Sequence, residues 1–335
     1  MASRMASHAV ALLGAAFLLV AAAPATGRFD VQGHRGARGL APENTLAAFA
    51  RALSLGVTTL ELDTGVTADG VVVVTHDPEL TPDLTREAKG RWLERPGPPI
   101  VRLTYDELQT YDVGRLRPGT PYAARYPEQI AADGQRIPRL SDVFALAARA
   151  GNGDVRFNVE AKSDPRKTAP TLAPEKFAEA VVRVVRQHRM EARTTIQSFD
   201  WRTLRHVRRV APAIGLVCLT VQRPGDDNVE AGRPGAPATL GGLDVDDFGG
   251  SVPRLVQAAG CAVWSPNALD LTPALVAEAH GLGLSVVPWT LNDPKQMDVF
   301  IGYGVDGIIT DRPDLLRQVL GARGLPLPGA TPVSP

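Results

Sequence analysis

Short apolar runs rich in β-branched residues alternate with longer stretches of helical period along almost the whole chain. This alternation is typical of repeated βα units built around a parallel sheet. Nine runs are candidate strands, at residues 29–34, 58–63, 71–76, 155–160, 194–199, 213–219, 262–267, 285–290 and 305–310. The third run follows the turn Ala68-Asp69-Gly70, so we expect it to return antiparallel to the second as a hairpin. Eight parallel strands then remain.

Helical patterns separate or follow these eight strands. They lie at residues 44–55, 141–150, 175–189, 201–210, 252–259, 272–282, 294–302 and 312–320. Eight strands with a helix for each favour a closed (β/α)8 barrel, the TIM-barrel fold, over an open doubly wound sheet. The predicted fold class is therefore α/β, with the barrel domain over residues 29–320.

The connection from the hairpin to the strand at 155–160 is longer than a single helix requires. Residues 77–138 within it are rich in proline, glycine, tyrosine and arginine, which predicts an inserted loop or small subdomain after the first hairpin. Loops of this length usually carry function.

Both ends of the chain are expected to lie outside the barrel. Residues 1–25 contain a basic Arg4, an apolar run and a final A-x-A motif, the pattern of a cleaved secretory signal peptide. An uncleaved membrane anchor is the alternative, but the run is shorter than the ~20 apolar residues of a spanning helix. We therefore expect an extracytoplasmic protein, periplasmic or secreted, with no membrane span after cleavage. Residues 324–335 are Pro-rich and aperiodic, which predicts a disordered tail.

Charge and cysteine content narrow the partners and the compartment. The 36 basic and 36 acidic residues cancel, so no charge surplus favours nucleic acid or an anionic membrane. Cys218 and Cys261 are the only cysteines, and an oxidising compartment would allow a bridge between them. Both lie in apolar runs, so two separate buried thiols are an equally good interpretation.

Polar side chains gather at one end of the predicted strands. Barrel enzymes hold their active sites at the carboxyl ends of their strands. The residues found at those ends here are His34, Glu61, Asp63, His76, Glu160, Lys162, Gln197, Trp289 and Asp311. Charged groups that recur at one end of apolar strands are hard to explain as core, so this pattern predicts an active site.

Glu61 and Asp63 stand two residues apart on one strand, so both carboxylates project to the same face. Left alone, they would repel each other, and a cation resolves this repulsion. Glu160 on another strand can supply a third carboxylate, and an all-oxygen site suits Ca²⁺ or Mg²⁺ better than zinc. A network of salt bridges to Arg35 or Lys162 without a metal is the alternative.

His34 and His76 are the two histidines at predicted strand ends. A pair of imidazoles can divide proton transfer, one removing a proton from a nucleophile and the other protonating a leaving oxygen. Arg35, next to His34, is a planar donor suited to phosphate oxygens. Glu43 has two interpretations: an acid in the first turn of the next helix, favoured by the helix dipole, or a group that leans back to orient the site.

Five motifs occur in order along the chain: HRGARGLAPENTLAAF, ELDTGVTADGVVVVTHD, NVEAK, QSF and VDGIITDRP. In order and spacing they resemble the glycerophosphodiester phosphodiesterase family, over about residues 29–320. The resemblance implies a TIM-barrel enzyme that hydrolyses glycerophosphodiesters, as small-molecule substrates, to an alcohol and sn-glycerol 3-phosphate. Arg38 and the Pro288-Trp289-Thr290 stretch depart from the usual family pattern.

The resemblance also implies roles for individual residues. His34 and His76 would act as general base and acid, and Glu61, Asp63 and Glu160 would hold one divalent cation. Arg35 and Lys162 would contact the phosphate. The long insertion and the signal peptide are similar to the secreted branch, which favours Ca²⁺ over Mg²⁺. We place Gln197 and Trp289 among the substrate-binding residues, and Glu43 and Asp311 in supporting positions.

Two other functions stay open at this stage. A lysophospholipase D-like phosphodiesterase would use the same site with an apolar channel, lined by insertion aromatics such as Trp92, Tyr105, Tyr111 and Tyr122. A non-catalytic extracytoplasmic binding protein on a degenerate barrel is the second. Degeneration should have removed some member of the reactive set, and every member is present. The sequence leaves the head-group preference and the oligomeric state open.

Overall fold

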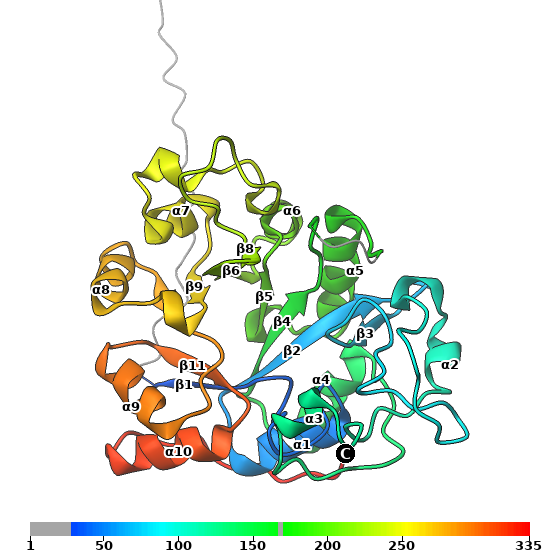
Figure 1. Cartoon of the computed structure of the whole chain (residues 1–335). Coiled ribbons are helices and arrows are strands. Elements are labelled where there is room, and N and C mark those ends of the chain that lie inside the picture. Colours follow the sequence, from blue (N-terminus) through cyan, green and yellow to red (C-terminus); the bar gives the residue numbers. More distant parts are fainter. Residues whose placement is uncertain (1–27, 167–169) are drawn as a thin grey trace, which may run out of the picture.

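Eight parallel strands form the wall of a barrel in the computed structural model, which describes residues 28–166 and 170–335. Their hydrogen-bonded order is β10–β9–β6–β5–β4–β2–β1–β11. Figure 1 labels all of these strands except β10. The strands are β1 (Asp30–Gly33), β2 (Thr59–Val66), β4 (Arg156–Ala161), β5 (Thr194–Ser198), β6 (Gly215–Thr220), β9 (Val263–Pro266), β10 (Ser285–Val286) and β11 (Gly307–Thr310). The backbone N–H groups of Asp306 and Ile309 donate to the carbonyls of Val286 and Pro288, which joins the two ends of this order. The predicted α/β barrel is confirmed.

The predicted hairpin is present as well. β3 (Val72–Val74) pairs antiparallel with the end of β2, with Val66 opposite Val72 and Thr64 opposite Val74. Because β3 lies off the barrel order, it extends β2 outward and leads the chain into the insertion.

Eight longer helices surround the strands (Figure 1). Their ends lie within two residues of the predicted ranges: α1 (Leu46–Leu55), α4 (Leu140–Arg149), α5 (Pro174–Gln187), α6 (Trp201–Val210), α7 (Val252–Ala259), α8 (Pro273–Gly281), α9 (Pro294–Gly302) and α10 (Pro313–Ala322). Side-chain oxygens accept hydrogen bonds from first-turn N–H groups at five of these helices, from the caps Thr45, Asp200, Ser251, Thr272 and Asp293. Such caps satisfy donors that have no partner inside the helix, so these local sequences set where the helices begin.

The two faces of each barrel strand bury different chemistry. On β2, Leu60 and Leu62 belong to the apolar core between strands and helices, while the alternate residues point into the barrel. The interior holds a polar layer, in which the Asn158 amide donates to the side-chain carbonyls of Gln32 and Gln197 at 3.0 and 2.8 Å. This layer is the floor of the site described below.

Residues 77–138 form a small subdomain beside β3 and run from α2 at the right of Figure 1 to α3 near α1. It contains η1 (Ile100–Arg102), α2 (Tyr105–Leu108) and α3 (Pro121–Ala124). A separate apolar cluster holds it together, made of Val73, Leu80, Ile100, Leu103, Leu108 and Ile137. Because Val73 belongs to β3, this cluster fastens the insertion to the barrel hairpin.

The remaining short elements lie in the loops. They are η2 (Glu191–Arg193), β7 (Gln222–Arg223), β8 (Asp226–Asp227), η3 (Ala238–Leu240), η4 (Val245–Phe248) and η5 (Ala268–Asp270). β7 and β8 pair antiparallel with each other directly after β6.

The C-terminal segment differs from the prediction of disorder for residues 324–335. The Thr331 N–H donates to the Leu53 carbonyl at the end of α1, and the Arg317 guanidinium donates to the Pro328 carbonyl. Val333 packs against the core, and the C-terminus lies near α1 in Figure 1. Composition predicted disorder because the segment has no periodicity, but its backbone is satisfied by tertiary contacts that composition does not show.

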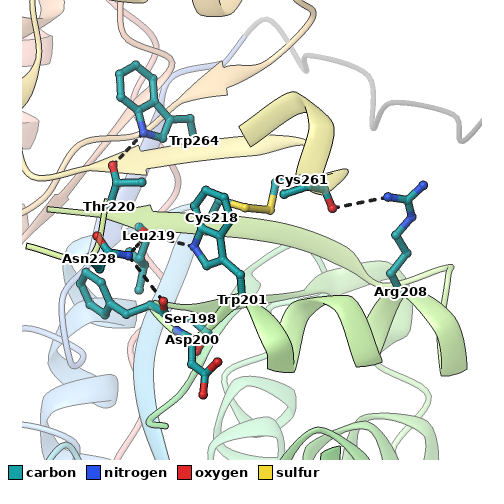
Figure 2. Close-up of a disulfide and its surroundings, with 12 residues drawn as sticks. Ser198, Asp200, Trp201, Arg208, Cys218, Leu219, Thr220, Asn228, Cys261 and Trp264 are labelled. Carbon is teal, nitrogen blue, oxygen red and sulfur yellow. Dashed lines mark hydrogen bonds between the residues drawn. A yellow bond between two sulfur atoms is a disulfide. The ribbon is translucent and has the colours of Figure 1, made fainter. Parts of the chain in front are cut away.

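The predicted signal peptide, residues 1–25, lies outside the described residues. Within the part of the chain that the structure describes, no helix combines the length and the apolar character that a membrane crossing needs. Of the two interpretations of the cysteines, the structure has the bridge: Cys218 on β6 is bonded to Cys261, just before β9 (Figure 2).

Candidate active site

Three buried carboxylates converge at the carboxyl ends of β2 and β4. Glu61 and Asp63 point to the same face of β2, and Asp63 is in register with Glu160 on β4. One oxygen of each lies within 4.8 Å of the others, and the three residues are only 1%, 1% and 6% exposed. The sequence-predicted trio is therefore brought together in space.

The pKa values of these three carboxylates reflect the negative charge that is buried in the cluster. Burial and then the neighbouring Asp63 raise the pKa of Glu61 well above its usual range. Burial also raises the pKa of Glu160 to about 7, although Lys162 opposes this. Burial acts in the same direction on Asp63, but the positive charge of Arg35, with smaller help from other cations, holds its pKa well below the usual range.

Two side-chain cations lie against this cluster. Arg35 Nε is 3.1 Å from Asp63 Oδ2, and Lys162 Nζ is 2.8 Å from Glu160 Oε1. The salt bridges of the alternative interpretation are therefore present, but two cations face three buried carboxylates. Among residues 28–166 and 170–335, Glu61 has no side-chain cation at ion-pair distance apart from a His34 nitrogen at 3.9 Å. A divalent cation bound by the three oxygens fits this deficit and the oxygen preference of Ca²⁺ and Mg²⁺.

Arg35 is held in place by Glu43. Arg35 Nη1 donates to Glu43 Oε1 at 2.5 Å, and the Tyr122 hydroxyl from the insertion donates to Glu43 Oε2. Glu43 precedes the N-cap Thr45 and is buried, so it is not a first-turn acid, and the helix-dipole interpretation is wrong. Within the described residues, the buried Arg35 Nε makes no hydrogen bond, because its 3.1 Å contact with Asp63 Oδ2 lacks hydrogen-bond geometry.

His34 at the end of β1 is backed by Asp311 at the end of β11. His34 Nδ1 is 2.7 Å from Asp311 Oδ1, and Arg38 also binds Asp311, through Nε at 2.8 Å and Nη2 at 3.1 Å. Two groups contact Nδ1: the Asp311 carboxylate, which only accepts, and Arg38 Nη2 at 3.0 Å, which only donates. The shorter contact is with Asp311 and favours a proton on Nδ1, with the lone pair on Nε2, which faces Glu61 at 3.9 Å. Burial and then Arg38 lower the pKa of His34 to about 4, which keeps the imidazole neutral.

His76, which follows β3, has a similar arrangement. Its Nδ1 is 2.9 Å from Asp77 Oδ1, so Asp77 orients this ring as Asp311 orients the other. Burial and then the positive charges of Arg35 and Lys162 lower the pKa of His76 to about 4. The two histidines therefore enter the cleft from different strand ends, each with a carboxylate behind it.

A cleft of about 330 Å³ opens above the carboxylates, and both histidines line it. Gln197 on β5 donates to Glu61 Oε1 at 2.7 Å, which ties the floor to the trio. Phe199 and Trp289 form one wall, with their rings edge to face and their centres 5.5 Å apart. Every site residue that the sequence singled out thus lies in this cleft or in contact with a residue that does.

The insertion contributes fewer aromatics to the cleft than the sequence suggested. Of the four candidates, Tyr122 lines it. Trp92 lies against Arg86, Tyr105 lies against Arg139, and Tyr111 packs on the apolar cluster of the insertion. The channel imagined from all four rings is therefore wrong, because three of them stabilise the insertion itself.

Three polar residues support the site although the sequence analysis gave them no role in it. Asp77 orients a histidine, and its position directly after His76 is a signal that could have been used. The Asn44 amide donates to Asp63 Oδ2, and the Asn292 amide donates to Asp311 Oδ2. For these two amides no local signal exists, because both contacts join separate segments of the chain.

Comparison with known proteins agrees with the geometry. The model of the "Glycerophosphoryl diester phosphodiesterase family" matches residues 34–315. A glycerophosphodiester phosphodiesterase of Caldanaerobacter subterraneus subsp. tengcongensis is 31% identical over 295 residues, covering 87% of this chain and 97% of the relative. A Silicibacter pomeroyi crystal structure, provisionally assigned as a glycerophosphoryl diester phosphodiesterase, is 39% identical with a TM-score of 0.78, over 90% of this chain and 95% of that one.

A more distant solved structure shares the fold. An Oleispira antarctica phosphodiesterase in complex with the product sn-glycerol-3-phosphate has a TM-score of 0.62 at 20% identity, covering 87% of this chain and 96% of that one.

Proposed function

Because the chain belongs to the glycerophosphoryl diester phosphodiesterase family, we propose that it hydrolyses glycerophosphodiesters to an alcohol and sn-glycerol 3-phosphate. The observation that carries this proposal is the convergence of three buried carboxylates with two carboxylate-backed histidines in one cleft. Two imidazoles, each oriented by a carboxylate, are suited to acid and base catalysis beside such a cluster.

The residues around the cleft have different roles in the proposed reaction. A divalent cation held by Glu61, Asp63 and Glu160 would supply positive charge to the phosphodiester and to the oxygen that attacks it. Arg35, whose Nε makes no hydrogen bond within the described residues, and Lys162 bind the phosphate oxygens. Their fixed charges meet the charge that develops at phosphorus.

Proton transfer falls to the two histidines. One neutral imidazole takes the proton of the attacking oxygen at its Nε2. The other acts as an imidazolium, a form that the negative charge of the bound phosphodiester favours, and gives its Nε2 proton to the alcohol oxygen as the bond from phosphorus to that oxygen breaks. The attacking oxygen belongs either to water or to the glycerol hydroxyl next to the phosphate. If the glycerol hydroxyl attacks, a cyclic phosphate forms first, and water opens it while the two histidines exchange roles.

The finer assignments also belong to this proposal. We expect Ca²⁺ in preference to Mg²⁺ at the carboxylates, and an extracytoplasmic location for the mature protein. The location is supported by the N-terminal sequence pattern and by the disulfide, since structural disulfides persist in oxidising compartments.

The test is release of sn-glycerol 3-phosphate from glycerophosphocholine by the protein without residues 1–25. Activity should disappear on chelation and return with Ca²⁺ or Mg²⁺ added separately, and the ion that restores it names the occupant. Activity untouched by chelators would remove the metal from the mechanism. Turnover of lysophospholipids in place of glycerophosphocholine would favour the lysophospholipase D-like alternative.

Single variants separate the histidines from the metal. His34→Asn and His76→Asn should each lower kcat by about 10²–10⁴-fold. His280→Asn is the matched control, because His280 is exposed on α8 and binds Asp306 away from the cleft. A small loss at both His34 and His76 would contradict acid and base catalysis by this pair.

A further inference from the structure

One segment of the insertion, residues 120–130, is fastened across the rim of the cleft. The Tyr122 hydroxyl binds Glu43, and the Gln129 amide donates to the Arg38 carbonyl at 2.7 Å. The Ile130 N–H donates to the Leu40 carbonyl at 3.0 Å. These contacts join α3 and the residues after it to the β1–α1 loop, so the segment has a defined position above the catalytic residues.

Arg125 ends α3 as an exposed residue at the edge of this cleft. It lines the same cavity as the two histidines and the three carboxylates. Its guanidinium carbon lies 5.8 Å from the ring centre of Tyr122 and 5.7 Å from that of Tyr126. Tyr126 is itself buried against the guanidinium of Arg38. The two tyrosine rings therefore hold the Arg125 guanidinium near one position by cation–π contact.

Arg125 differs from the other cleft cations in its partners. Arg35 binds Glu43 and Asp63, Arg38 binds Asp311, and Lys162 binds Glu160. For Arg125, no carboxylate of residues 28–166 or 170–335 lies within ion-pair distance. Its charge is thus the one among these four that the described protein does not neutralise, and an anionic group of a ligand can do so.

A second hollow adjoins the cleft, and acidic side chains outnumber basic ones among its described lining residues. Beyond Lys162 the cavity continues into a hollow lined by Asp77, Asp164, Arg166 and Asp226. Its described lining has four carboxylates and two cations, since Glu160 and Lys162 belong to it as well. Phe199 and Trp289 line both this hollow and the cleft. An anionic substituent of the substrate is repelled from this hollow and attracted toward Arg125.

We propose that Arg125 is a specificity residue that favours glycerophosphodiesters whose alcohol portion carries a carboxylate. This inference rests on the proposed function. The glycerophosphoryl group occupies the centre of the cleft, over the three carboxylates, and the head group extends to the rim beneath α3. There the guanidinium pairs with the carboxylate of the head group and does not touch the reacting phosphate.

The test compares two substrates that differ by one carboxylate, glycerophosphoserine and glycerophosphoethanolamine. We expect the wild-type protein to have the higher kcat/KM for glycerophosphoserine. Arg125→Gln should lower the ratio of the two kcat/KM values about tenfold, which corresponds to about 1.4 kcal/mol. Arg125→Lys should keep part of the ratio because it keeps the charge. Arg136→Gln, an exposed arginine of the same insertion, is the matched control and should leave the ratio unchanged.

Two results would overturn the inference while leaving the proposed function intact. The first is an equal loss on both substrates in Arg125→Gln, which would place Arg125 on the phosphate shared by both. The second is an unchanged ratio with an unchanged melting temperature. If the wild-type protein hydrolyses neither substrate with Ca²⁺ or Mg²⁺ present, the proposed function fails first, and the inference falls with it.

Discussion

The disulfide between Cys218 and Cys261 should provide a large share of the stability of this protein. It joins β6 to the residue at position 261, just before β9 (Figure 2). β6 and β9 are already neighbours in the barrel. A link between residues 43 positions apart restricts the unfolded chain, and the chain-entropy relation gives about 4 kcal/mol at 25 °C for a loop of this size. Net stabilities of domains are about 5–15 kcal/mol, so loss of the bond should be easily measured.

The same bond should matter little for catalysis. Leu219 lines the cleft, so its neighbour Cys218 on β6 points to the other face, into the core between strands and helices. Reduction should therefore lower the free energy of unfolding and leave kcat/KM within about twofold of the oxidised protein, since no cleft contact is lost.

Urea unfolding followed by circular dichroism, with and without reductant, measures this difference. Reduced wild-type protein keeps both sulfurs and isolates the effect of the cross-link, whereas the double variant Cys218→Ala with Cys261→Ala also leaves a cavity and should be less stable still. The double variant is the control for the reductant, to which it should not respond. A difference below about 1 kcal/mol between oxidised and reduced protein would refute the loop-entropy reasoning.

Three further changes test the site. Asp311→Asn should lower kcat by about 10²–10⁴-fold, because an amide can present a donor to His34 Nδ1 and shift the proton of the ring to Nε2. Measurement of kcat across a range of pH checks this, and a loss in kcat below threefold would contradict it. In chelator, the melting temperature of Glu160→Gln should be no lower than that of the wild type, because the new amide can donate to Asp63. With Ca²⁺ added, the variant should lose most of the rise in melting temperature that the wild type gains. An undiminished rise would argue against the carboxylate site. Tyr122→Phe should cost about 1–3 kcal/mol, because a buried carboxylate loses its donor, and urea unfolding at unchanged m would show whether it does.

Local patterns in the sequence determined the elements and the faces of the strands. Hydrophobic period and capping residues act over a few positions, so the eight helices could be predicted to within two residues of their ends. The alternation of strand side chains is local too, which is why Glu61 and Asp63 could be placed on one face. Since the carboxyl ends of parallel strands share one rim, the composition of the cleft followed from the fold class.

What each side chain does in that cleft was decided by the tertiary structure. His34 and Asp311 are 277 residues apart in sequence, and their contact exists because β1 and β11 are neighbours when the barrel closes. The same holds for Glu43, which meets an insertion tyrosine, and for the C-terminal segment, which finds acceptors on α1. Such contacts depend on strand order and register and on how a loop packs, and these are properties of the whole chain that no short window contains.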